Sequence, residues 1–283
     1  MTEISMQGKI CLVTGSSTGI GKVTARELAR MGATVVMVCR NRARGEAAQA
    51  EIKAASGSER VDLIVADLSS LAEVRRAAEE FKQRYTQLHV LIHNAGGVNY
   101  VRKMTSDGLE ATFAANYLAP FLLTELLLDI LKASAPARII NVSSTAHLRG
   151  KIDFDDLQGE KKYSVWKAYC QAKLALILFT YELARQLQGT GVTVNALHPG
   201  VVASDFGRGF NGFLRFGWKL ASRFMISVEQ GARTTLYLAT SPEVEGVSGK
   251  YFVNSKERKS SSLSYNEALR QRLWKVSEEL IRK

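Results

Sequence analysis

An apolar run that leads directly into a glycine-rich turn constrains the fold more than any other feature of the chain. Residues 9–14 are typical of a buried strand, and Gly15-Ser-Ser-Thr-Gly19-Ile-Gly21 follows without a break. A helical pattern comes next and ends at Gly32. Glycines permit a tight turn and let the backbone approach a pyrophosphate, which the free N–H groups at the helix start can bind. A glycine turn without a ligand is the alternative.

The strand, turn and helix together predict a dinucleotide site. In NAD-selective sites an acidic residue after the second strand holds the ribose 2′-hydroxyl. Here the second apolar run, 33–39, ends at Arg40 with no acid beside it. Arg40 and Lys22 suit a 2′-phosphate, so the predicted cofactor is NADP(H); two exposed surface cations are the alternative. The turn residues expected to contact the cofactor are Gly15, Ser17, Thr18, Gly19, Ile20, Gly21 and Lys22.

Two later segments are further candidates for the cofactor site. Asp67 and Leu68 follow the third apolar run, 61–66, where a carboxylate can accept an N–H from adenine or serve a helix N-cap region. The motif Asn94-Ala95-Gly96 follows the fourth run, 88–93, and its small residues would let backbone and cofactor pass closely. Both segments come directly after a predicted strand, as the glycine turn does.

The remaining pattern predicts an α/β fold in one domain. Further strand-like runs cover 138–144, 191–197 and 250–253, and helical patterns lie between the strands. This alternation indicates a Rossmann-type, doubly wound parallel sheet of about seven strands flanked by helices. The chain has 283 residues, 46% of them hydrophobic, and only 4 prolines, without a low-complexity linker. We therefore expect residues 1–283 to form a single domain.

Tyr169 and Lys173 are the candidate catalytic pair. They lie four residues apart at the start of an apolar-periodic helix and would project from one face. A nearby ammonium favours the phenolate, and a phenol with a lowered pKa can exchange a proton with an alcohol or carbonyl oxygen. The spacing alone is weak, because Tyr163 and Lys167 repeat it six residues earlier. A tyrosine and a lysine on a solvated helix face are the alternative.

These motifs jointly resemble the short-chain dehydrogenase/reductase superfamily. The matches include Thr14-Gly15-x-x-x-Gly19-x-Gly21, Asn94-Ala95-Gly96, Asn116, Ser144, Tyr169-x-x-x-Lys173 and Pro199-Gly200, in the order of the family and over nearly the whole chain. The stretches 141–147, 168–174, 191–202 and 241–252 look like the retinol dehydrogenase branch. So does the long insert between Ser144 and Tyr169, which in that branch precedes the catalytic tyrosine and would contain Tyr163.

The resemblance implies a role for each catalytic candidate. Tyr169 would be the general acid or base, and Lys173 would hold the nicotinamide ribose and lower the pKa of Tyr169. Ser144 would hydrogen-bond the substrate oxygen, with Ser143 the weaker candidate because neighbouring strand residues point to opposite sides. Asn116 would anchor a proton-passing water, and Pro120 favours a kink in its helix. Further cofactor contacts would come from Pro199, Gly200, Val202 and Ser204. No metal is expected.

Two residues depart from the family pattern. The family more often has asparagine at the position of His93 and threonine at the position of Ser204. Ser204 keeps a hydroxyl for the carboxamide end of the cofactor. We interpret His93, like His89, as a partly buried strand residue and not as a catalyst.

Residues 205–227 carry aromatic and basic side chains in irregular alternation and predict a substrate lid or a membrane-surface segment. A segment that simply belongs to the core is the alternative. The implied substrate is a bulky lipophilic alcohol, aldehyde or ketone of the retinol/retinal type. Steroids, lipid aldehydes, polycyclic ketones and tetrapyrroles stay open, as does a non-catalytic NADP(H)-binding regulator. We expect a cytoplasmic protein, with peripheral membrane contact and a homodimer left open. The net charge of +11 is scattered along the chain, which argues against a nucleic-acid partner.

The three cysteines are few and unclustered, so they predict neither a disulfide framework nor a zinc site. Cys11 and Cys39 lie in apolar runs and are expected to be buried. The N-terminus has no signal-like apolar stretch, and no run is long enough to predict a transmembrane helix.

Overall fold

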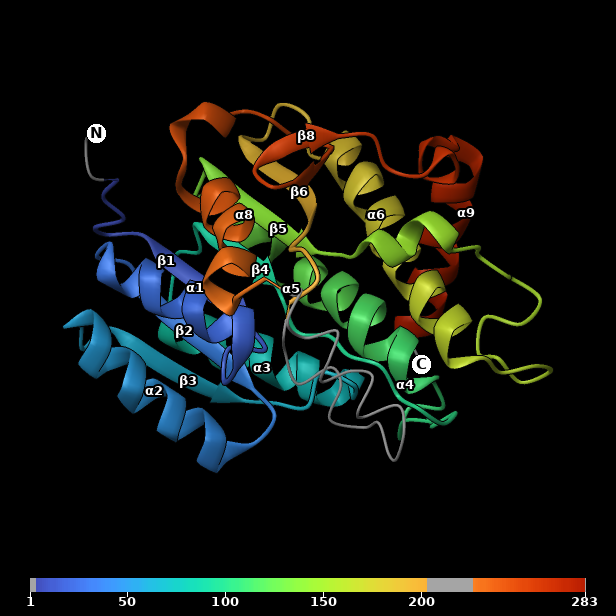
Figure 1. Ribbon diagram of the computed structural model, residues 1–283, viewed down its shortest axis with the longest axis horizontal. Coiled ribbons are helices and arrows are strands. Elements are labelled where there is room, and N and C mark those ends of the chain that lie inside the picture. The colour runs from blue at the N-terminus through green and yellow to red at the C-terminus, as the bar shows by residue number, and fades with distance from the viewer. Residues whose placement is uncertain (1–3, 203–225, 283) are drawn as a thin grey trace.

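A computed structural model describes residues 4–202 and 226–282 of the chain. They form an α/β domain built on an eight-stranded sheet in the order β3-β2-β1-β4-β5-β6-β7-β8 (Figure 1). The seven parallel strands are β1 (Ile10–Thr14), β2 (Thr34–Cys39), β3 (Val61–Val65), β4 (Val90–His93), β5 (Ala137–Val142), β6 (Val192–His198) and β7 (Lys250–Val253). The strand order reverses between β1 and β4, so the predicted doubly wound topology is confirmed.

The sheet has one strand beyond the seven parallel ones. The eighth strand, β8 (Lys256–Arg258), pairs antiparallel with β7. The two strands are joined by Asn254 and Ser255, which both have positive φ (51° and 57°), the backbone of a tight two-residue hairpin turn. All three residues of β8 are exposed. The strand therefore has no apolar alternation by which it could be found in the sequence.

Helices cover both faces of the sheet (Figure 1). One face carries α1 (Gly19–Arg30), α2 (Arg42–Ser56) and α8 (Val228–Thr240), whose apolar residues pack with the sheet in one core. The other carries α3 (Leu71–Arg84), α5 (Ala119–Ala133), α6 (Val165–Gln186) and, over them, α9 (Glu267–Ile281). The two cores bury both faces of the parallel strands, which explains why the central strands β1, β2 and β4 are almost entirely apolar.

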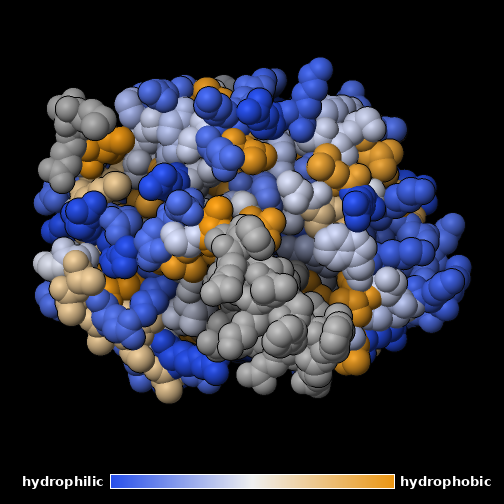
Figure 2. Space-filling model, in the orientation of Figure 1, coloured by the Kyte–Doolittle hydropathy of each residue, from blue (hydrophilic) through white to orange (hydrophobic). Residues whose placement is uncertain are grey.

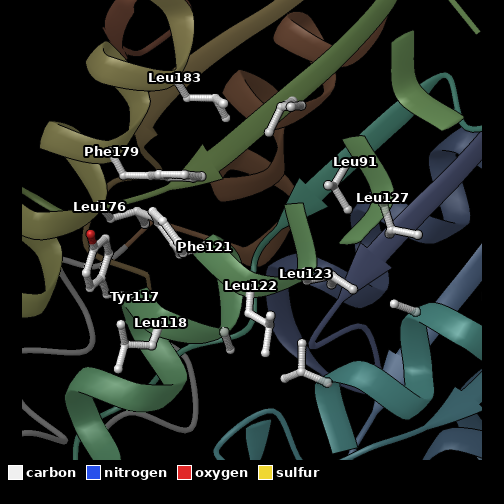
Figure 3. Packing of buried hydrophobic residues seen from close by; sticks show 14 of the residues in the cluster. Leu91, Tyr117, Leu118, Phe121, Leu122, Leu123, Leu127, Leu176, Phe179 and Leu183 are labelled. Carbon is white, nitrogen blue, oxygen red and sulfur yellow. The ribbon is translucent and has the colours of Figure 1, made fainter. Parts of the chain in front are cut away.

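The second core fixes α6, the helix that carries Tyr169 and Lys173. In Figure 3, Tyr117 and Phe121 lie against Phe179 of α6, and the Phe121 and Phe179 ring centroids are 5.4 Å apart. Trp274 of α9 stacks on Phe179 at 5.8 Å. The Tyr117 hydroxyl also hydrogen-bonds Ser277 of α9 at 2.6 Å. Buried aromatic pairs of this kind give α6 a single position relative to the sheet.

The helix that contains Asn116 and Pro120 is not uniform. It consists of α4 (Ala111–Phe113), a π-helical turn, η1 (Ala114–Leu118), and α5. Within it, the Ala119 N–H bonds the Ala114 carbonyl, five residues back. Pro120 follows at once and cannot donate to the carbonyl of Asn116. The kink expected from Pro120 therefore takes the form of a π turn, a feature that is frequent at functional sites.

The insert between Ser144 and Tyr169 also contains helical structure. A short 3₁₀ helix, η2 (Thr145–Arg149), follows β5, and α6 already begins at Val165. Two further 3₁₀ turns are η5 (Pro242–Val244) and η6 (Ser262–Tyr265). Cys11 and Cys39 are buried as expected, and Cys170 is buried too.

On the face of the molecule that Figure 2 shows, hydrophilic side chains alternate with small groups of hydrophobic ones. Within the described ranges, one stretch, Ala111–Ala133, is long and apolar enough to cross a membrane by length and composition. In the fold 67% of its apolar window is buried, because it is the central core helix of one sheet face.

Candidate active site

The predicted site residues that follow strands lie at the carboxyl ends of β1 to β6, along one edge of the sheet. This edge includes the point between β1 and β4 where the strand order reverses, which is where ligands bind in open α/β sheets. A groove of about 820 Å³ lies at the opposite edge, around Lys9, His89 and Arg138, which precede or begin their strands. None of the predicted site residues lines it, so the groove is not the candidate site.

The glycine turn and the Asn94 loop are joined by hydrogen bonds. Asn94 Nδ2 donates to the carbonyls of Thr14 (2.9 Å) and Gly15 (3.1 Å). Thr14 Oγ1 accepts the N–H groups of Asn94 and Ala95, both at 3.0 Å. A Cβ on Gly21 would lie 2.3 Å from Asn94 Nδ2, and one on Gly15 would lie 2.7 Å from the Ala95 Cα. Both glycines are therefore required by the approach of the two loops.

The start of α1 has the properties of a pyrophosphate site. Thr18 precedes the helix and does not cap it with its side chain, and the first turn contains no acidic residue. Gly19 has a φ of +58° and open space where a Cβ would be. A phosphate could approach these N–H groups without a competing carboxylate. The residues present therefore fit the phosphates of a dinucleotide, with Ser17 and Ile20 in the same turn.

Lys22 and Arg40, the two predicted 2′-phosphate ligands, differ in their surroundings. Lys22 forms an ion pair with Glu51 of α2. Arg40 is exposed directly after β2, and Asn41 behind it caps α2 by accepting the Arg44 N–H at 2.9 Å. A surface pair such as Lys22–Glu51 contributes little to stability. Arg40 is thus the more accessible of the two cations.

Asp67 takes part in a local turn after β3. Its Oδ1 accepts the N–H (3.0 Å) and the hydroxyl (2.8 Å) of Ser69. The N-cap of α3 is Ser70 and not Asp67. Asp67 therefore stabilises the turn that precedes the helix and does not cap the helix itself. Leu68 packs against the core beside α3.

Asn116 lies in the π turn and is held by the loop after β4. Its Oδ1 accepts the Gly97 N–H at 3.1 Å, and its Nδ2 donates to the carbonyls of Gly97 (2.9 Å) and Thr112 (2.7 Å). A Cβ on Gly96 would lie 2.6 Å from Asn116 Oδ1 and 3.2 Å from Lys173 Nζ. The loop after β4, the π turn and α6 therefore meet at Gly96.

Ser143 and Ser144 have different environments, as the alternation of strand residues predicts. The Ser143 hydroxyl donates to the Lys173 carbonyl at 3.0 Å and serves packing. Ser144 Oγ accepts the Ala146 N–H at 3.2 Å, and its hydroxyl also hydrogen-bonds Tyr169. Ser144 is thus the hydroxyl that lies beside the phenol.

Tyr169 and Lys173 are both buried on the inner face of α6, with 9% and 5% of their surfaces exposed. Lys173 Nζ lies 5.7 Å from the Tyr169 ring centroid and donates to the Val142 carbonyl at 3.1 Å. Burial lowers the pKa of Lys173 to about 8. Burial raises the pKa of Tyr169 to about 12, against the opposing effect of its hydrogen bond with Ser144. The expected depression of the Tyr169 pKa is therefore wrong for the protein chain by itself, because desolvation dominates.

Tyr163 is engaged elsewhere. It precedes α6, and its hydroxyl donates to Glu110 Oε1 at 3.2 Å and to the Asn99 carbonyl at 3.4 Å. Glu110 is 1% exposed and also accepts the N–H groups at the start of α4. Tyr163 therefore joins the insert to α4, and the structure places it away from the Ser144–Lys173 cluster.

The loop after β6 completes the edge. Gly200 has a φ of +96°, and a Cβ there would lie 2.3 Å from Ile226 Cδ1. Pro199 precedes it, and Val202 pairs with Ile226. A Cβ on Gly231 would meet both Val202 and Ile20, so this loop lies close to the glycine turn. Ser204 and residues 205–225 of the predicted lid lie outside the described residues.

Several residues that hold the site together were missed by the sequence reasoning. Thr14 and Gly97 supply the hydrogen bonds described above, and His147 and His198 lie behind Ser144. His89 and His93 are more buried than expected, at 8% and 2% exposure. Burial lowers the pKa of His93 to about 3, and its Nε2 lies 2.8 Å from Thr124 Oγ1. A histidine in an apolar strand gives no sequence signal for such a partner.

The fold and this cluster define a short-chain oxidoreductase, and the comparison with protein families agrees. A model of the short chain dehydrogenase family matches residues 9–212, and the chain belongs to this family. It is an oxidoreductase that acts on CH–OH or C=O groups and binds a nicotinamide dinucleotide.

Within the family the chain lies on the retinol dehydrogenase-like branch, as predicted. It is 48% identical to mouse retinol dehydrogenase 12 (Mus musculus) over 99% of the chain and 88% of the relative. It is 45% identical to human retinol dehydrogenase 11 (Homo sapiens), with the same coverage. A solved protein from Mycobacterium Paratuberculosis aligns with a TM-score of 0.80 at 32% identity, covering 100% of this chain and 96% of that one. The Pseudomonas aeruginosa RhlG/NADP active-site complex aligns with a TM-score of 0.72 at 27% identity, covering 89% of this chain and 96% of that one.

Proposed function

We propose that the chain is an NADP(H)-dependent oxidoreductase that interconverts a bulky lipophilic alcohol and its aldehyde or ketone, of the retinol/retinal type. The observation that carries this proposal is the meeting of Asn116, Ser144, Tyr169 and Lys173 beside the glycine turn. The names of the relatives, at 43–48% identity, support the retinoid class of substrate. The aromatic residues of segment 205–227 support an apolar substrate.

The proposed chemistry follows from the surroundings of the phenol. When bound, a reduced nicotinamide would supply the hydride that the carbonyl carbon accepts. Tyr169, whose pKa of about 12 keeps it protonated near neutral pH, gives its proton to the carbonyl oxygen as charge develops there. Ser144 donates a hydrogen bond to the same oxygen, and the Lys173 ammonium holds the ribose and stabilises the phenolate that is left.

Asn116 keeps the loop after β4 next to Lys173, and we propose that it also anchors the water that returns a proton to Lys173. We further propose that segment 205–227 covers the substrate and contacts a membrane surface, and that the protein is otherwise cytoplasmic. The mixture of aromatic and basic residues in the segment supports both roles.

The proposal is tested by adding NADPH and a panel of carbonyl compounds that includes all-trans-retinal, a steroid ketone and short aldehydes, and following absorbance at the nicotinamide band. We expect turnover with retinal and little with short aldehydes. Tight NADPH binding without turnover of any carbonyl compound would instead identify a regulator.

The exposed guanidinium of Arg40 is expected to select NADP(H). Replacing it in Arg40→Glu should raise the KM for NADPH on the order of 10- to 100-fold, because a charge-assisted phosphate contact is lost and a like charge is introduced. The KM for NADH should fall. Arg44→Glu makes the same charge change in the exposed first turn of α2 and is the control. Equal responses of the two variants would contradict the assignment. The measurement is steady-state kinetics with each cofactor.

A methyl group at Gly96 is expected to disturb the site through Asn116 and Lys173, which would lie 2.6 and 3.2 Å from its Cβ. Gly96→Ala should lower kcat by about tenfold or more, because small misplacements of reacting groups are costly. Gly97→Ala is the matched control, since nothing lies within 4 Å of a Cβ there. Similar kcat values for the two variants would contradict this geometry.

A further inference from the structure

Two buried histidines hold the peptide group that follows Ser144. The Ser144 carbonyl accepts a hydrogen bond from His147 Nδ1 at 2.6 Å and another from the His147 backbone N–H at 3.1 Å. At the other end of the same peptide group, the Thr145 N–H donates to His198 Nδ1 at 3.4 Å. His147 belongs to η2 and His198 ends β6, so the two rings reach this group from different elements.

The partners determine the protonation state of each ring. A carbonyl only accepts, so His147 Nδ1 carries the proton, and His147 Nε2 is then free to accept the Ser261 N–H at 3.2 Å. His198 Nδ1 accepts, so its proton is on Nε2. Both rings are therefore neutral. Their burial agrees with this, because it lowers the pKa of both, that of His198 to about 4.

The surroundings leave the His147 ring little freedom. The residue is fully buried, and its ring packs edge-on against Tyr251 with centroids 4.8 Å apart. Through Ser261 it is joined to the segment before η6, where Ser260 hydrogen-bonds Tyr181 of α6 at 2.7 Å. The ring thus connects the backbone of Ser144 with the chain that packs against the helix of Tyr169.

We propose that His147 and His198 are positioning residues for Ser144, which hold its carbonyl and the following N–H and so aim its hydroxyl at the substrate oxygen beside Tyr169. The inference rests on the proposed function for the role of Ser144. The Ser144 Cα lies in the plane of the held peptide group, so a displacement of this group moves the atom that carries the side chain. The Ser144 Oγ also accepts the Ala146 N–H, which lies just beyond the held group, so its orientation depends on the same backbone. Neither histidine touches the reacting atoms in this arrangement.

Substitution of His147 by asparagine or by glutamine distinguishes the hydrogen bond of its Nδ1 from that of its Nε2. An asparagine amide can place a donor where Nδ1 lies and so keep the Ser144 bond. A glutamine amide reaches the position of Nε2, so it keeps the Ser261 bond and loses the one to Ser144. We expect kcat to fall on the order of 10- to 100-fold in His147→Gln but to stay within about threefold in His147→Asn, with NADPH affinity unchanged in both.

Two substitutions at His198 provide an independent test. His198→Asn keeps an acceptor for the Thr145 N–H, whereas His198→Leu has similar bulk and leaves that N–H without one. We expect a smaller loss of kcat than for His147→Gln, because the bond is longer, and we expect it only in the leucine variant.

The measurements are kcat and KM for retinal, NADPH affinity by fluorescence, thermal unfolding, and deuterium exchange of the peptide that covers residues 144–150. A low kcat in His147→Gln alone, with faster exchange there, supports the inference. Equal losses in His147→Asn and His147→Gln, the reverse order, or losses that follow the melting temperature would overturn it. If the wild-type chain shows no turnover, the proposed function fails. The exchange data then decide the positioning role, which equal exchange in the two variants would refute.

Discussion

A phenylalanine at Tyr169 is expected to reduce kcat on the order of 10²- to 10⁴-fold, the usual contribution of a general acid. The ring would keep its place beside Trp166 (centroids 6.1 Å apart) and lose only the hydroxyl. Because a buried hydroxyl with a strongly raised pKa is removed and no volume is added, the fold should be retained. NADPH binding should change little, since Lys173 and the glycine turn are untouched. Single-turnover kinetics and fluorescence titration of NADPH check the two halves of this result.

Tyr163→Phe is the matched control for that experiment. It removes the other phenol with a lysine four residues later, and in the structure this phenol bonds Glu110 and the Asn99 carbonyl. We expect kcat within about threefold of wild type and a stability loss of about 1 kcal/mol from the missing hydrogen bond. Loss of turnover in Tyr163→Phe with activity retained in Tyr169→Phe would reverse the assignment.

The comparison of Tyr169 with Tyr163 shows what the sequence could and could not predict. The strands and the glycine turn were found because both faces of the parallel sheet are buried and because positive φ and close approach require glycine at Gly15 and Gly21. The spacing of Tyr169 and Lys173 is local and was also readable. The spacing could not choose between the two tyrosines, and the choice of Tyr169 came from the resemblance of the insert to the retinol dehydrogenase branch. The partner of Tyr163 had no local signal, because the fold brings Glu110 to it from 53 residues away.

Other features had no local signal at all. The partners of His147 and His198 are backbone groups, which every residue carries, so no sequence pattern marks them. Pro120 predicted an irregularity in this helix. The hydrogen bonding of the π turn, however, depends on the packing of Tyr117 against α6 and α9. The sign of the Tyr169 pKa shift was missed for a related reason: burial, which raises it, is a property of the whole fold.

Replacing the buried ammonium of Lys173 with an apolar isostere is expected to stabilise the protein and inactivate it. At pH 7 both the folded and unfolded chains carry the proton, and a pKa lowered from 10.5 to about 8 corresponds to a cost of about 3 kcal/mol in the folded state. Lys173→Met removes this cost and loses the bond to the Val142 carbonyl, worth about 1 kcal/mol. We therefore expect a net gain of about 2 kcal/mol, with kcat reduced on the order of 100-fold or more.

The pH dependence distinguishes this explanation from better packing. Between pH 8 and 10.5 the folded chain releases the Lys173 proton before the unfolded chain does, so the unfolded state binds more protons and wild-type stability rises with pH relative to the variant. The advantage of Lys173→Met should therefore shrink across this window. Denaturant unfolding of both proteins at pH 7, 8, 9 and 10 measures the difference, in which groups common to both cancel. Lys167→Met, at an exposed position on the same helix, should show no such trend. A stability gain that is constant with pH would mean that Lys173 is not buried as an ammonium at pH 7, and the proposed electrostatic role of Lys173 beside Tyr169 would then have to be abandoned.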